Sequence, residues 1–165
     1  MKKSRTWISF ITLVFLLSLP VHTWAWSGEV VGITDGDTIT VLNSKTQEDV
    51  KIRLYGIDTP ERGQAFGKKA KQFTSDMVFG RLVEVEPVDI DRYGRTVALV
   101  TVFQRLVNEE LANAGFAWVY TCCCDEPICE RWKVLEYEAR EAKRGLWADP
   151  NAIPPWEYRR KKRSK

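Results

Sequence analysis

The sequence predicts an α+β fold in which a five-stranded β-barrel carries three helices. Short apolar segments typical of strands occur three times before residue 56 and twice between residues 81 and 103. A segment with helical periodicity separates the two groups, and two more helical segments follow the last strand. Five short strands with a helix between the third and the fourth are compatible with an OB-type barrel.

The first three strands are expected to form a meander. A turn over Thr34–Asp37 joins the first two, and a polar hairpin loop over 43–49 joins the second to the third. The third strand alternates apolar and polar side chains, so it has one apolar face. The last two strands are joined by the turn-rich segment Asp89–Arg95. The expected strands cover residues 29–33, 38–42, 50–55, 81–86 and 96–103.

A helix is expected after the third strand. Its apolar side chains Phe66, Ala70, Phe73 and Met77 recur at spacings that place them on one face, and Gly80 is positioned to end it.

Two shorter signals predict the remaining helices. Asn108 is expected to cap a short helix over 109–114 that Gly115 ends. The last helix begins near Pro127. Its expected buried face consists of Ile128, Trp132, Leu135, Ala139 and Ala142.

The first 25 residues have the three-part pattern of a secretory signal peptide. Lys2, Lys3 and Arg5 precede an apolar run over 7–19, and small residues follow up to Ala25. The alternative is an uncleaved anchor, but the run is shorter than the ~20 residues that a bilayer requires. We expect cleavage after Ala25 and a secreted or periplasmic chain with no membrane attachment.

The mature chain would then consist of a domain over 26–149 and a Pro-rich basic tail over 150–165, which we expect to be irregular. Six basic residues stand between 159 and 165, and residues 26–158 carry a net charge of −6. Any binding of a polyanion must therefore come from a local site or from the tail.

Histidine chemistry is excluded from the mature chain, because His22 is the one histidine in the sequence and lies in the signal peptide. This removes a histidine general base, a Ser-His-Asp triad and a histidine-ligated zinc site. Carboxylates, arginines, tyrosines or cysteines must carry the chemistry.

The four cysteines are Cys122, Cys123, Cys124 and Cys129. Export would place them in an oxidising compartment, where a structural disulfide is expected. Three pairings are open, and a loop from Cys123 or Cys124 to Cys129 is easier to form than a bridge between adjacent residues. Three consecutive ligands do not easily converge on a tetrahedral zinc ion.

Three segments place charged side chains where strands end. Asp35–Thr38 sets two carboxylates on a turn, a pattern that alone is common in hairpins. Arg53–Glu61 brings an arginine and two carboxylates together with a proline, and Pro60 restricts the backbone of the residue before it. Asp91–Arg95 forms a turn that delivers Arg95 to the start of a strand.

In this order, these segments resemble the signatures of the staphylococcal nuclease (thermonuclease) family, whose members have an SNase-like OB-fold domain. The resemblance covers about residues 28–148. The loop between Val41 and Arg53 is a little longer than in the best-known members. The three consecutive cysteines and the basic tail lie outside the minimal pattern of the family.

The resemblance implies a calcium-dependent reaction. Asp37 and Asp58, with the carbonyl of Thr59, would hold Ca²⁺, which prefers such hard oxygen ligands. Glu61 would act as the general base on a water molecule that attacks phosphorus.

The resemblance also implies the substrate. Arg53 and Arg95 would bind the phosphate of DNA or RNA and neutralise its charge in the transition state, leaving 3′-phosphate ends. Taken singly, each arginine is better explained by a surface ion pair, and Glu61 by an acidic residue in a first helical turn; the complete set in this order is what favours the site. No stable protein partner is expected, and the chain is expected to be a monomer.

Two alternatives remain open at this point. One is a non-catalytic binding module on the same barrel, and the other is a single-strand binder with a structural calcium ion. Tyr93 and Tyr120 would stack on a base or sugar, or else pack against the barrel. The basic residues 159–165 would add salt-sensitive affinity for phosphates, or else form a solvated end.

Overall fold

The computed structural model describes residues 25–120, 124 and 127–164. The predicted signal peptide lies outside the described residues except for Ala25, and so do Cys122 and Cys123. Within the described part of the chain, no helix has the length and apolar character needed to span a bilayer.

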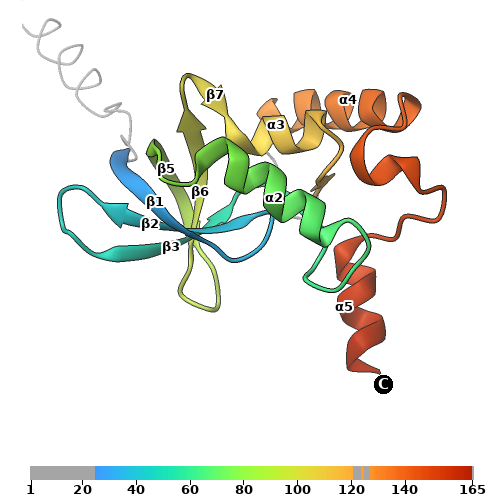
Figure 1. Ribbon diagram of the computed structural model, residues 1–165, viewed down its shortest axis with the longest axis horizontal. Coiled ribbons are helices and arrows are strands. Elements are labelled where there is room, and N and C mark those ends of the chain that lie inside the picture. The colour runs from blue at the N-terminus through green and yellow to red at the C-terminus, as the bar shows by residue number, and fades with distance from the viewer. Residues whose placement is uncertain (1–24, 121–123, 125–126, 165) are drawn as a thin grey trace, which may run out of the picture.

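Five strands close a barrel, which confirms the predicted fold class (Figure 1). The strands follow one another in the order β3-β2-β1-β5-β6 with antiparallel pairing, and a parallel pairing between β3 and β6 closes the ring. The strands are β1 (Trp26–Ile33), β2 (Thr38–Asn43), β3 (Asp49–Leu54), β5 (Leu82–Ile90) and β6 (Thr96–Val102).

Three two-residue strands extend this framework. The strand β7 (Arg105–Leu106) pairs with the end of β6. The strand β4 (Ile57–Asp58) pairs with β8 (Trp118–Val119), which ties the segment after β3 to the C-terminal half of the domain.

The core lies inside the barrel and under the helices. Alternating residues of each long strand point inward, as the period of two requires. The inward residues of β2 and β3 include Ile39, Val41, Ile52 and Leu54, all nearly inaccessible to solvent. Their neighbours from α3 and α4 include Leu111 and Trp132.

The helices are α2 (Gly67–Val78), α3 (Val107–Asn113), α4 (Pro127–Glu141) and α5 (Pro155–Arg163), with a short 3₁₀ turn η2 (Gly145–Ala148). Three of the four agree with the predicted helices, and α5 is additional. In Figure 1, α2 crosses one side of the barrel, α3 and α4 lie together beyond its end, and α5 projects away from the domain.

The predicted helix after the third strand begins one residue later than its apolar stripe. Phe66 is the N-cap of α2 and has a positive φ of 65°, so it belongs to the preceding loop. Ala70 and Met77 are buried, and Phe73 packs against Phe116 with ring centroids 5.2 Å apart. Gly80, with a φ of 69°, follows the helix as expected.

The prediction that Asn108 caps the short helix is wrong. The helix α3 begins at Val107, and the side chain of Asn108 is fully buried. It accepts a hydrogen bond from Val100 N–H at 3.1 Å and donates one to the carbonyl of Tyr55 at 2.9 Å. Asn108 therefore joins α3 to the barrel wall, because a buried amide must be satisfied by such contacts.

A disulfide joins Cys124 to Cys129, with Cα atoms 5.8 Å apart. This is one of the two pairings that the sequence favoured. Cys129 is fully buried in α4, and the position of Cys124 beside Gly56 brings the bridge against the segment after β3. The disulfide is therefore the structural link that was expected.

The expectation that residues 150–165 are irregular is wrong for the most basic part of the tail. Pro154 and Pro155 begin the helix α5, since proline is well suited to a first helical turn. Pro155 is buried, whereas Arg160 is exposed. Packing of the first turn against the domain thus allows a segment of low hydrophobicity to be helical.

Candidate active site

The turn between β1 and β2 carries the first carboxylate of the site. The side chain of Asp37 is buried, with 5% of its surface exposed. Its Oδ2 atom accepts hydrogen bonds from the N–H and the hydroxyl of Thr59, at 2.6 and 3.0 Å. Its Oδ1 atom accepts one from the hydroxyl of Thr38 at 3.2 Å. Asp37 thus ties the β1–β2 turn to the segment after β4.

Gly36 is required in this turn by close packing rather than by its dihedral angles. An Asp-Gly turn is often explained by a positive φ at the glycine, but Gly36 has none. A Cβ atom at this position would lie 2.8 Å from the hydroxyl of Thr59 and 2.9 Å from the Cβ of Ala70. The absence of a side chain lets the turn approach both segments.

The strands β3 and β4 supply an arginine and the second carboxylate. Arg53 pairs in register with Thr38 of β2, so its side chain emerges beside Asp37. Its Nη2 atom donates to Asp58 Oδ1 at 2.9 Å, and its Nη1 atom forms a close ion pair with Asp37 that lacks the geometry of a hydrogen bond. The Asp58 side chain is 2% exposed. One guanidinium therefore bridges both buried carboxylates.

Glu61 lies in the loop between β4 and α2. Its N–H donates to the side-chain oxygen of Gln64 at 3.0 Å, and its carbonyl accepts from the backbone N–H of Gln64 at 2.9 Å. Gly67 lets the helix start close to this loop, because a Cβ there would lie 2.2 Å from the carbonyl oxygen of Glu61. The Glu61 side chain is 33% exposed, so it lies at the solvent edge of the site.

The second arginine comes from the loop between β5 and β6. Asp91 Oδ1 accepts from the N–H groups of Tyr93 and Arg95, at 2.9 and 3.0 Å, and its Oδ2 atom accepts from Arg95 Nε at 2.7 Å. Arg95 Nη1 also donates to Thr38 Oγ1 at 3.4 Å. The Asp91 turn therefore directs the guanidinium of Arg95 toward the Asp37 turn.

All six residues that the sequence assigned to the site lie in one group joined by hydrogen bonds and ion pairs. Arg53 joins the two aspartates, Thr59 bonds to Asp37, and Thr38 links Asp37 to Arg95. Glu61 joins the group through Arg159, which lies outside the predicted set and contacts both Asp58 and Glu61. The structure thus brings the predicted site residues together, while their individual roles remain predictions.

Two pKa shifts reflect these contacts. Burial lowers the pKa of the Arg53 guanidinium, and the charge of Asp58 opposes this shift. Burial by itself would raise the pKa of Asp91, but hydrogen bonds from Arg95 and from the Tyr93 N–H leave that pKa below its ordinary value. Asp91 is therefore held in its charged form, which fixes the Nε side of Arg95.

The oxygen donors of the site suit calcium in their chemistry. Asp37 and Asp58 offer two carboxylates that one guanidinium bridges, and the Thr59 carbonyl is the neighbouring backbone donor. Across the described ranges, no group of three or more His, Cys, Asp or Glu side chains is arranged to hold a metal ion. Two carboxylates and one carbonyl are fewer oxygen ligands than the roughly six to eight that calcium takes, so water molecules would have to complete the set.

The sequence analysis gave no role in the site to three residues that the structure places there. Thr38 and Gln64 act through ordinary hydrogen bonds that no local pattern reveals. Arg159 is separated by nearly one hundred residues from the carboxylates that it contacts. The helical signal of two prolines followed by a basic segment could have indicated α5, though not its location.

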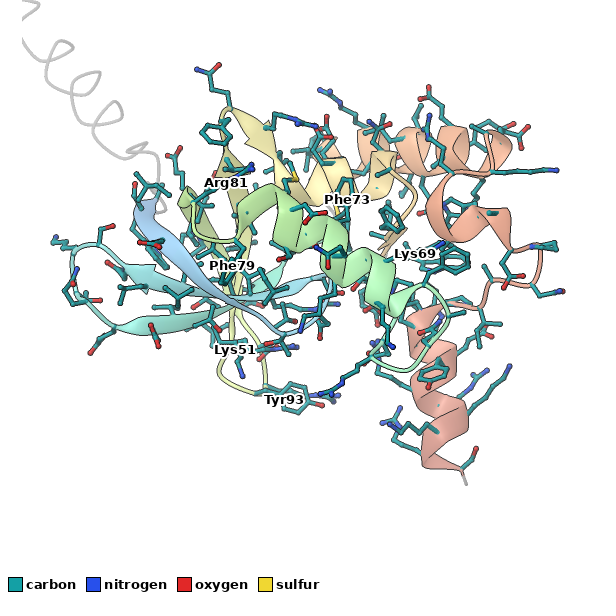
Figure 2. All side chains as sticks on the ribbon, viewed as in Figure 1. Lys51, Lys69, Phe73, Phe79, Arg81 and Tyr93 are labelled. Atoms are coloured by element: carbon teal, nitrogen blue, oxygen red, sulfur yellow. A yellow bond between two sulfur atoms is a disulfide. The ribbon has the colours of Figure 1, made fainter. Side chains whose placement is uncertain are left out.

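The two tyrosines have different surroundings. Tyr93 is 70% exposed at the tip of the loop between β5 and β6 (Figure 2). The guanidinium carbon of Arg95 lies 5.6 Å from the centroid of its ring. Tyr120 packs against Trp156, with ring centroids 5.4 Å apart. Tyr93 thus presents an aromatic face beside the site, and Tyr120 contacts the start of α5.

Comparison with known proteins agrees with this geometry. Residues 51–149 match the family model described as staphylococcal nuclease homologue. The chain is 42% identical to Protein ParB of Escherichia coli over 96% of this chain and 94% of the relative. It is 37% identical to a micrococcal nuclease of Shigella flexneri, covering 97% and 96%. It is 40% identical to an uncharacterized endonuclease of Escherichia coli O157:H7, covering 93% and 98%.

On a closed OB-type barrel whose edge gathers acidic and guanidinium groups, these nuclease and endonuclease relatives support a hydrolase of the nuclease class. The match over most of the chain makes the assignment more specific. The protein belongs to the staphylococcal nuclease family.

Proposed function

We propose that the protein is an exported, calcium-dependent nuclease that hydrolyses phosphodiester bonds of DNA and RNA and leaves 3′-phosphate ends. The observation that carries the proposal is the gathering of two buried aspartates, two arginines and Glu61 at one edge of the barrel. Nuclease activity follows from the family. The metal, the substrates, the products and the export are what we propose.

The arginines would bind the phosphate group. Arg53 is held by two carboxylates and Arg95 by Asp91, so both guanidinium groups are oriented before substrate arrives. A guanidinium has five N–H donors, and these ion pairs use some of them while others remain for phosphate oxygens. Such oriented donors stabilise charge that develops in the transition state.

Glu61 would act as the general base. It would take a proton from a water molecule whose oxygen bonds to phosphorus, while the bond from phosphorus to the 5′-oxygen breaks. The 5′-oxygen would take a proton from solvent, and the phosphate would stay on the 3′-oxygen. The partial exposure of Glu61 supports this role, because the carboxylate can contact both water and substrate.

Calcium would be held by the carboxylates of Asp37 and Asp58 and by the Thr59 carbonyl. When bound, it would supply positive charge that activates water and neutralises the phosphate. The support is the chemistry of the donors, because two carboxylates joined by one guanidinium and a neighbouring backbone carbonyl are hard oxygen ligands of the kind that calcium prefers.

Export rests on the N-terminal pattern of residues 1–25. The disulfide between Cys124 and Cys129 supports it, because disulfides persist in oxidising compartments.

The test uses purified residues 26–165 with end-labelled DNA and RNA in calcium, in magnesium and with a chelator. We expect cleavage of both polymers in calcium, none with the chelator, and products whose 3′ ends can be ligated to an added 5′-phosphorylated strand only after a phosphatase removes the 3′-phosphate. Binding without cleavage in calcium would favour a non-catalytic module instead. Cleavage that survives the chelator would contradict the metal requirement.

A further inference from the structure

The C-terminal helix α5 is anchored beside the candidate active site. Pro155 is buried, and Trp156 packs against the rings of Trp118 and Tyr120, at centroid distances of 5.9 and 5.4 Å. In Figure 1 the first turn of α5 lies next to the loop that precedes α2. The helix therefore starts from a fixed point on the domain.

A single glutamine connects this anchor to the loop of the general base. The side-chain nitrogen of Gln64 donates to the carbonyl of Ile153 at 2.8 Å, just before α5. The side-chain oxygen of Gln64 accepts from the N–H of Glu61 at 3.0 Å. The start of α5 and the backbone of Glu61 thus share one bridging residue.

Arg159 lies four residues after Pro155 and therefore on the same face of α5. Its Nη2 atom donates to Asp58 Oδ2 at 2.8 Å, and its Nη1 atom donates to Asp58 Oδ1 at 3.2 Å and to Glu61 Oε1 at 2.5 Å. The side chain is 40% exposed, but that of Asp58 is 2% exposed. The guanidinium reaches a buried carboxylate from the solvent side.

Both oxygens of Asp58 are engaged by guanidinium groups. Oδ2 accepts from Arg159, and Oδ1 accepts from Arg159 and from Arg53. An arginine guanidinium keeps its positive charge throughout the pH range in which proteins are folded. Arg159 thus remains a full positive charge on the same carboxylates to which we assign metal binding and base catalysis.

We propose that Arg159 is a further residue of the active site and that it sets the affinity of the site for calcium. The inference rests on the proposed function, which assigns Asp58 to the metal. A carboxylate has about four lone pairs, and three of those on Asp58 accept hydrogen bonds, two from Arg159 and one from Arg53, so calcium competes with Arg159 for half of them. Arg159 is a positioning residue, since it acts through Asp58 and Glu61.

The competition would place the site among weak calcium binders. Sites with dissociation constants of about 10⁻⁴–10⁻³ M are filled where calcium is plentiful, as outside cells, and stay empty at cytosolic concentrations. A nuclease with such a site would remain inactive until it is exported.

The experiment is a calorimetric titration of residues 26–165 with calcium chloride alone, without nucleic acid. The variant is Arg159→Gln, and the matched control is Arg160→Gln, which removes the same charge from an exposed neighbour on the same helix. Because both variants lose one positive charge, their general attraction for cations is equal. We expect Arg159→Gln to bind calcium about 5- to 10-fold more tightly than the control. This factor corresponds to the free energy of an ion pair between a partly exposed arginine and a buried carboxylate.

Equal or weaker calcium binding by Arg159→Gln would overturn the inference. A third variant, Arg159→Lys, keeps the charge but loses the planar fork that spans two carboxylates, so its affinity should lie between those of wild type and Arg159→Gln. Thermal unfolding of each variant checks that the domain is intact. A residue needed only to hold the fold would lower calcium affinity when replaced.

Failure of this inference is distinguishable from failure of the proposed function. If wild type cleaves DNA in calcium while Arg159→Gln binds calcium no more tightly than its control, the proposed function stands and the role of Arg159 is wrong. If calcium binds more tightly to Arg159→Gln but no protein cleaves, the competition stands and the catalytic proposal is wrong. If no variant binds calcium, both are wrong.

Discussion

Replacing Asp91 with asparagine tests whether the turn before β6 orients Arg95 for its work on the phosphate. Asp91 uses one oxygen for the backbone of the turn and the other for Arg95 Nε. Asparagine keeps the oxygen that accepts from the two backbone N–H groups, so the turn is preserved. Its NH₂ group cannot accept from Nε, so only the contact with the guanidinium is lost.

The expected loss follows from the geometry of this contact. The Nε to Oδ2 distance is 2.7 Å, and the side chains of Arg95 and Asp91 are 26% and 18% exposed. A hydrogen bond between charged groups contributes about 1.5–3 kcal/mol, and solvent near the surface reduces this to about 1 kcal/mol. If that energy serves to position Arg95 in the transition state, kcat/KM falls about fivefold.

The lowered pKa of Asp91 determines the pH range in which the predicted loss of activity should be seen. A carboxyl group whose pKa is lower in the folded state contributes stability above its unfolded pKa, and this contribution is lost as the pH falls through the folded value. The pair of Asp91 and Arg95 is therefore intact above about pH 4. The fivefold ratio should therefore stay constant above about pH 4 and shrink only in more acidic solution.

The assay is steady-state cleavage of a labelled DNA in calcium. Asp89→Asn is the matched control, because Asp89 is exposed and its carboxylate accepts from the neighbouring backbone N–H of Ile90. Adding Asp91→Asn to Arg95→Lys should cost less than Asp91→Asn costs alone, since both changes act on one guanidinium. If Asp91→Asn and Asp89→Asn have equal activity, the reasoning is refuted.

Three further changes test other parts of the structure. Arg95→Lys should lower turnover at least tenfold in the same cleavage assay despite its retained charge, because the two-pronged contact with phosphate is lost; wild-type turnover would contradict this. Gly36→Ala should lower the free energy of unfolding by about 1–3 kcal/mol in a urea titration, because its Cβ would collide with Thr59. An unchanged midpoint would contradict the claim that close packing requires glycine here. Reduction of the bridge between Cys124 and Cys129 should lower the free energy of unfolding by about 2 kcal/mol, as expected for a disulfide that closes a short loop. The loss would be measured as a lower Tm in reductant, and an unchanged Tm would contradict a structural role.

The barrel could be predicted because its signal is local. Alternating apolar side chains identify each strand, and the order of strands and helices restricts the architecture. The parallel closure of β3 on β6, in which Ile52 pairs with Thr96, could not be predicted in this way. It depends on the curvature of the whole sheet and not on either strand alone.

Local motifs misled where tertiary contacts use the same residue. Asn108 has the residue type of a helix cap, but its amide is used inside the domain to bond to Val100 and Tyr55. Gly36 has the residue type of a turn with a positive φ, but close packing against Thr59 is what requires it. In each case the residue type correctly marked the position as structurally important, but the local motif gave the wrong physical reason.

The candidate site was predictable as a set of residues and not as a network. Each carboxylate and arginine stands at the end of a strand, so one edge of the barrel gathers them. Arg159 has no such marker, since a basic residue near a chain terminus is usually solvated. Its contact with Asp58 depends on how Pro155 and Trp156 anchor the helix.

The central claim is that Glu61 removes a proton from water at this site, and single-turnover cleavage by Glu61→Gln tests it most directly. The measurement compares the cleavage rate of labelled DNA in saturating calcium with the dissociation constant of the same DNA, using Glu84→Gln on the exposed face of β5 as the control. We predict a rate about 10²- to 10⁴-fold below that of the control, with a nearly unchanged dissociation constant. A rate equal to that of the control would contradict the account.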